Sequence, residues 1–76
     1  MRRDEWLADF CERLGLEAPS KEEVVALLDL AATAAHSSER TAAPLACWVA
    51  GRSGRPLAEL GEVAKEVAPA TAGEQG

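Results

Sequence analysis

His36 is the one histidine in the chain, so any site that needs an imidazole must use it. It lies three residues before Glu39, a spacing that places two metal ligands on one face of a helix. Dimetal helical bundles need two such pairs and additional inward-pointing glutamates, whereas this chain offers one pair. We therefore predict no bound metal and no cofactor. A solvated histidine near a helix C-terminus, where its cation interacts favourably with the dipole, is the simpler explanation.

The alternative to a solvated histidine is that the chain is a regulatory domain, which binds a small ligand or a metal ion through His36, Glu39 and Arg40. Nucleophilic catalysis has less support. Cys47 lies in an apolar run, a setting that disfavours the thiolate form. The serines that follow His36 cannot form a triad with it through sequence adjacency alone. The sequence therefore predicts a protein that is not an enzyme.

Residues 52–55, Arg-Ser-Gly-Arg, could present amides and guanidinium groups to a phosphate at the start of a helix. The run lacks the spacing of a phosphate-binding P-loop, and Pro56 removes one amide. A solvated turn is therefore predicted here. The net charge of −5 also argues against nucleic-acid binding, because lysine and arginine supply most non-specific affinity for phosphates.

Among the elements that would position these residues, the most apolar is a helix predicted over residues 20–38. Its valines, leucines and alanines cover most of its circumference, which indicates neighbours on more than one side. Ser20 and Glu23 match the capping-box pattern at its start. We predict that this is the central helix of a small all-α, four-helix bundle.

The other helices are predicted near residues 4–14, 44–51 and 56–68. Asp4 is the expected N-cap of the first helix and Gly15 its end. Its apolar face is expected in the core (Trp6, Leu7, Phe10, Cys11 and Leu14). Pro44 suits the first position of the third helix, which Gly51 would end. Residues 1–68 are expected to form one helical domain, followed by a disordered tail over residues 69–76.

No charged residue occurs between positions 41 and 51. Such a run is either buried or exposed as an apolar surface for a partner, and both interpretations stay open. Aromatic anchors dominate protein interfaces, so the second interpretation centres on Trp48. The predicted partner-binding residues are Trp48, Arg40 and Leu45.

The sequence lacks the features of a secreted or membrane-spanning protein, and this predicts its compartment and its class of partner. Met1 is followed by two arginines, Asp4 and Glu5, not by the apolar run of a signal peptide. No uncharged run approaches the ~20 residues that cross a bilayer, so no membrane role is expected. The two cysteines lie far apart without a second pair, which predicts free, reduced thiols in the core. We expect a cytoplasmic chain that binds a protein partner or self-associates.

The run AHSSERTAAPLACWVAG, together with an EWL opening and the segment VVALLDLA, resembles a family of small uncharacterised actinobacterial domains. That family shows a histidine, a Glu-Arg pair and an Ala-Pro-Leu step, which fall here on His36, Glu39, Arg40, Pro44 and Leu45. The resemblance covers residues 4–68. Trp48 stands where a phenylalanine is expected, which puts the exact pocket shape in doubt.

Some members of that family are fused or adjacent to molybdenum-cofactor guanylyltransferase-like proteins. The resemblance therefore implies an accessory or protein-binding role near molybdenum-cofactor metabolism, without a known activity. Combined with the apolar run, it predicts a non-catalytic accessory or interaction module. Residues 36–49 would then be its contact surface.

Overall fold

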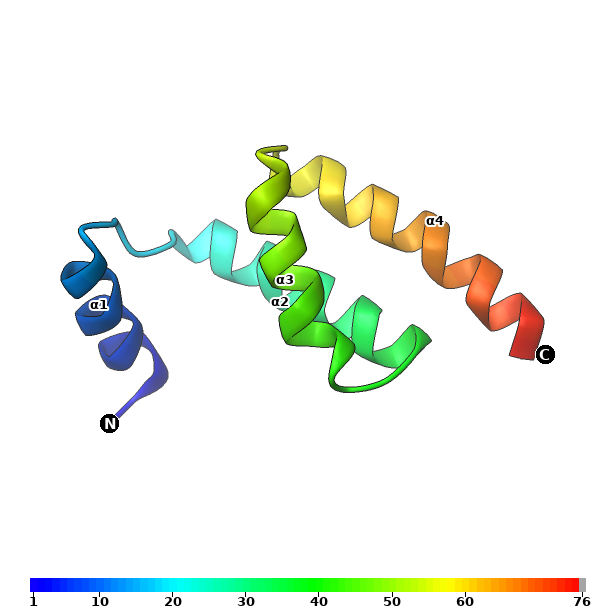
Figure 1. Ribbon diagram of the computed structural model, residues 1–76, viewed down its shortest axis with the longest axis horizontal. Helices are drawn as coiled ribbons and strands as arrows, with labels where there is room; N and C mark the ends of the chain where they lie inside the picture. Colours follow the sequence, from blue (N-terminus) through cyan, green and yellow to red (C-terminus); the bar gives the residue numbers. More distant parts are fainter. Residues whose placement is uncertain (76) are drawn as a thin grey trace.

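The computed structural model describes the backbone of residues 1–75 and the side chains of residues 1–67. It contains four helices and, within residues 1–75, no strand (Figure 1), so the all-α, four-helix prediction is confirmed. The helices are α1 (Arg3–Leu14), α2 (Lys21–Ser37), α3 (Ala42–Ser53) and α4 (Leu57–Gln75).

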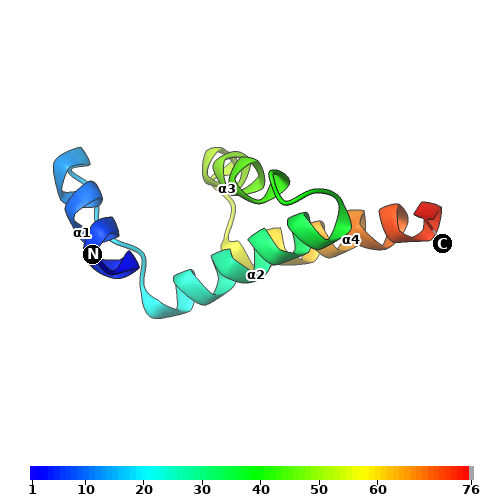
Figure 2. The same ribbon diagram turned by 90° about the horizontal axis from the view of Figure 1, so that it is seen from below.

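Helix α2 is the element on which α3 and α4 both pack. In Figures 1 and 2, α2 and α4 run alongside each other while α3 crosses α2 steeply. The two hydrophobic residues that are buried among residues 1–67 are Leu30 of α2 and Ala50 of α3. The predicted central position of α2 is therefore confirmed, but part of its apolar surface is uncovered. Val25 and Leu28 remain exposed.

Helix α1 stands apart from the other three helices, at the end of the molecule opposite the C-terminus (Figure 1). The molecule measures 44 × 26 × 18 Å, with a radius of gyration of 13.8 Å. A spherical domain of this length has a radius of gyration of about 11 Å. The molecule is therefore elongated, and no helix covers the outer side of α1.

The predicted core face of α1 is correspondingly wrong in part. Trp6 is 53% exposed and Phe10 is 47% exposed, and Leu14 is exposed as well, whereas Leu7 and Cys11 are half-buried. The physical reason is that the periodicity identifies an apolar face but does not supply the neighbour that would cover it. Cys11 and Cys47 are both free, as predicted, but neither lies in a fully buried core.

The start of α2 and the end of α1 lie where the sequence predicts them. The Glu23 amide donates to Ser20 Oγ at 3.1 Å, and the Ser20 amide donates to Glu23 Oε1 at 2.7 Å, which completes the capping box. Gly15 ends α1 with a φ of 73°, the left-handed conformation that glycine adopts without strain. Asp4, in contrast, is not the N-cap, because α1 already begins at Arg3 and its Ncap residue is Arg2.

The predicted bounds of the third helix are also corrected. Helix α3 begins at Ala42, so Pro44 occupies its third position. Proline is tolerated there because the first four amides of a helix have no intrahelical partner. The helix continues through Gly51 and ends at Ser53, and it is capped by Gly54, whose φ is 70°. Gly51 does not end it because its backbone remains helical.

Helix α4 begins directly after Pro56, whose carbonyl accepts from the amides of Glu59 and Leu60 at 3.1 Å. The backbone is helical to Gln75, beyond the end predicted near residue 68. The predicted disordered tail, residues 69–76, lies outside the residues whose side chains are described.

Candidate functional site

His36, Glu39 and Arg40 lie at the corner between α2 and α3. His36 is exposed in the last turn of α2, in agreement with its predicted place near a helix C-terminus. Glu39 and Arg40 are exposed in the connection, where their carbonyls accept from the amides of Ala42 and Ala43. Residues 1–67 contain no group of three histidine, cysteine or acidic side chains that could hold a metal ion.

Trp48 and Leu45 are one turn apart on α3, and both side chains point away from the packed core. Leu45 is 66% exposed and Trp48 is 63% exposed. The Arg52 guanidinium lies 4.8 Å from the centre of the Trp48 ring, a cation–π contact that leaves the ring on the surface. The uncharged run is therefore exposed over much of its length, with Ala50 as its buried residue.

An apolar groove lies between α3 and α4, above Leu30 of α2. We call it the α3/α4 groove. Its volume is about 470 Å³, and none of the charged side chains within residues 1–67 lines it. Its walls carry exposed aliphatic side chains, among which Val49 is 60% exposed. The lining residues are Leu30, Ala42, Leu45, Ala46, Val49, Ala50, Leu60, Val63, Ala64 and Val67.

The predicted contact surface, residues 36–49, includes Leu45 and Val49 of this groove, but the sequence did not single out Val63 as a surface residue. The signal was present in the width of the apolar faces. The groove is lined by positions 42, 45, 46 and 49 of α3, together with the buried position 50, and by positions 60, 63, 64 and 67 of α4. Both sets follow the i, i+3, i+4, i+7 pattern of a helix face that requires a neighbour. Since α2 alone cannot cover both faces, part of each remains in solvent.

The second exposed apolar surface is on α1. The rings of Trp6 and Phe10 stack at a centroid distance of 4.9 Å, and Leu14 continues the line along the helix. We call Trp6, Phe10 and Leu14 the α1 stripe. Beside it, Arg13 Nε donates to Asp9 Oδ1 at 3.1 Å, an exposed pair that contributes little stability.

A hollow of about 480 Å³ separates the other side of α1 from the start of α2. Leu7 faces Val24 and Val25 across it, and Arg3 and Asp4 lie at its edge. The hydrogen bond and the negative charge of Asp4 raise the pKa of the Arg3 guanidinium. The hollow accordingly has a charged edge, whereas no charged side chain lines the α3/α4 groove.

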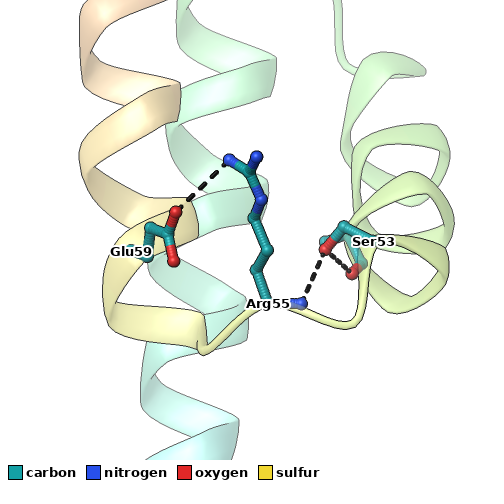
Figure 3. Close-up of polar contacts among 4 residues, drawn as sticks. Ser53, Arg55 and Glu59 are labelled. Atoms are coloured by element: carbon teal, nitrogen blue, oxygen red, sulfur yellow. Dashed lines mark hydrogen bonds and ion pairs between the residues drawn. The ribbon is translucent and has the colours of Figure 1, made fainter.

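Residues 52–55 combine the last two residues of α3 with the start of the short connection to α4 (Figure 3), so the predicted turn begins later than expected. Ser53 Oγ donates to the Ala50 carbonyl at 2.7 Å and accepts from the Arg55 amide at 3.1 Å. Arg55 Nη1 lies 3.3 Å from Glu59 Oε1. The Arg55 amide and guanidinium that a phosphate would require therefore already have partners within the chain.

The comparison with known families concerns the whole helical unit. A family model described as a domain of unknown function, DUF6457, matches residues 1–75. The chain belongs to this family. No curated protein and no solved structure matches it. Because the match includes α1, this helix is part of the DUF6457 domain even though it lies apart from α2, α3 and α4.

None of the helices described for this DUF6457 chain, within residues 1–75, combines the length and the apolar composition needed to cross a membrane. Their exposed apolar side chains are instead distributed over the α1 stripe, the back of α2, and the two walls of the α3/α4 groove.

Proposed function

We propose that this DUF6457 chain is a non-catalytic protein-interaction module. The observation that carries the proposal is that most of its large apolar side chains are exposed and few are buried. Among residues 1–67, only Leu30 and Ala50 are buried hydrophobics, whereas both tryptophans and the phenylalanine are exposed. Contiguous exposed apolar surface on a small domain marks an interaction site.

The type of surface favours a polypeptide as the partner. Aromatic side chains are enriched at the centres of protein interfaces, and charged residues are depleted there. Leu45 lines the α3/α4 groove, in which residues 1–67 place no charged side chain, and Trp48 is exposed on the next turn of α3. The contact surface extends from Arg40 at the α2–α3 corner through Leu45 to Trp48.

The wider role that fits the resemblance is that of a cytoplasmic accessory domain in molybdenum-cofactor metabolism of actinobacteria. The free thiols of Cys11 and Cys47 are compatible with a reducing compartment. The His-Glu-Arg residues at the α2–α3 corner and the Pro44-Leu45 step support the resemblance.

The test is native mass spectrometry of the chain purified from its host, with Leu45→Ser as the variant. We expect the wild-type chain to retain a polypeptide in a defined stoichiometry, and Leu45→Ser to lose it, because an apolar anchor is removed. Leu16→Ser is the matched control, since Leu16 is 65% exposed but lies in the α1–α2 connector. A wild-type chain that carries no second polypeptide at all would contradict the proposal.

The alternative of a metal-binding regulator that uses His36, Glu39 and Arg40 predicts a different result. We expect zinc, iron(II) and manganese(II) to leave the melting temperature unchanged, because residues 1–67 contain no cluster of three ligands. The measurement is thermal unfolding with and without each ion. A rise of several degrees that His36→Ala abolishes would favour the alternative.

A further inference from the structure

We infer that the partner is a second copy of this chain, and that the α1 stripe of each copy lies in the α3/α4 groove of the other. The inference rests on the proposed function and names its partner. It joins the exposed apolar stripe of α1 to the apolar groove between α3 and α4, and α1 stands apart from these two helices within one chain (Figure 1). The resulting contact is reciprocal, as two-fold symmetry requires.

The insert and the groove match in length and period. Trp6, Phe10 and Leu14 follow each other at intervals of four residues, so the α1 stripe is about 12 Å long. The lining of the groove extends from position 42 to position 50 of α3, about 12 Å of helix, and from position 60 to position 67 of α4, about 10.5 Å. Amphipathic helices that occupy apolar grooves in other proteins use anchors with this helical spacing. With α2 as its floor, the groove and the inserted helix complete a four-helix arrangement.

The chemistry of the two surfaces also matches. No charged side chain lines the groove, and the α1 stripe presents two stacked aromatic rings and one leucine. The ion pair of Asp9 with Arg13 lies beside the stripe and stays at the edge of the contact. Insertion therefore removes apolar area from water without the burial of an unpaired charge.

The surface area of the chain supports a partner of this size. The chain exposes 6132 Å². A folded monomer of 8.0 kDa exposes about 4,450 Å². The difference of about 1,700 Å² reflects the elongated shape of the molecule and is larger than the ~800 Å² that each partner contributes to a standard interface. The exposed area is therefore sufficient for contact with a second copy.

The connector between α1 and α2 favours insertion of α1 into the groove of a second copy over insertion into the groove of its own chain. Its first end is fixed by Leu16, whose amide donates to the Cys11 carbonyl at 2.9 Å, and its second end by the Ser20 capping box. Between these ends α1 faces the first turns of its own α2 through Leu7. The exposed stripe is then free to contact another copy, and Leu7 and Cys11 keep their positions.

The experiment combines two variants of the full chain, each of which disables one surface. Val49→Asp places a carboxylate in the groove, and Phe10→Asp places one in the α1 stripe. We expect light scattering to give the mass of two chains for the wild type and of one chain for each variant. An unpaired carboxylate in an apolar contact weakens the dimer about a hundredfold or more. Because Phe10 and Val49 are exposed in the single chain, the helical content measured by circular dichroism stays unchanged.

The mixture of the two variants decides the arrangement. The intact α1 stripe of Val49→Asp can enter the intact groove of Phe10→Asp, so we expect mixing to restore a particle of two chains with one working contact. Leu28→Asp is the matched control, because Leu28 is also exposed on a helix but does not line the groove. It should remain dimeric.

Two outcomes would overturn the inference. A wild-type chain that is monomeric at all concentrations excludes the second copy; a different polypeptide found in the native mass spectra would leave the proposed function intact. A wild-type dimer that Leu28→Asp dissociates, or whose two variants fail to pair on mixing, would show that the copies meet through other surfaces.

Discussion

Ser20 forms the two hydrogen bonds of the capping box that begins α2. Its hydroxyl accepts from one free amide of α2, and its own amide donates to Glu23. The end of the same helix is closed differently: the Ser37 and Ser38 hydroxyls donate to the carbonyls of Thr33 and Ala34. At the residue scale, both ends of the central helix are therefore defined by side-chain contacts within one turn.

We expect Ser20→Ala to lower the free energy of unfolding by about 1 kcal/mol, because one amide of the first turn loses its acceptor. Urea unfolding at a fixed protein concentration measures the change. Ser38→Ala is the control, since its hydroxyl caps no amide and is exposed, and its effect should be smaller. An equal loss for both variants would contradict the assignment of the cap.

At the scale of elements, the helices differ in how much of their apolar face is covered. Helix α2 contacts two neighbours, α3 and α4 each contact α2, and α1 has no comparable contact. Glycine inside these helices is not required by packing. A Cβ added at Gly51 or Gly61 would meet no atom within 4 Å.

Gly61→Ala and Gly51→Ala should therefore each raise the free energy of unfolding by about 0.5–1 kcal/mol, because alanine loses less conformational entropy in a helix. Gly15→Ala should lower it, since φ at Gly15 is +73° and a side chain there is strained. Thermal unfolding of the three variants provides the test. Destabilisation by Gly61→Ala would show that another chain approaches the helix at that position.

At the scale of the whole molecule, a single copy has little buried apolar surface from which to gain stability. Only Leu30 and Ala50 are buried hydrophobics within residues 1–67, in an elongated molecule 44 Å long. Stability that depends on a second copy rises with protein concentration, because association removes folded chains from the unfolding equilibrium.

We expect the melting temperature to rise by about 3–5 °C for each tenfold increase in protein concentration. Calorimetry over a hundredfold concentration range measures it. Val49→Asp should melt at a temperature that does not depend on concentration. If the melting temperature of the wild type is also constant, the fold is stable as a single chain.

Several features of the fold could be predicted because they depend on residues close together in the chain. The number of helices follows from apolar periodicity, the start of α2 from Ser20 and Glu23, and the end of α1 from Gly15. The bounds of α3 were predicted less well. Proline is acceptable at several positions of a first turn, and both Gly51 and Gly54 offered a plausible end.

The sequence by itself determined the helical class, the local caps and the apolar character of residues 41–51. Only the tertiary structure decided which apolar faces are covered. Periodicity shows that Trp6, Phe10 and Val49 lie on apolar helix faces. Whether another helix covers such a face depends on the positions of helices that are distant in the sequence. In this chain α3 and α4 each pack on α2 and not closely on each other, and α1 has no comparable contact, so the α1 stripe and the α3/α4 groove remain exposed.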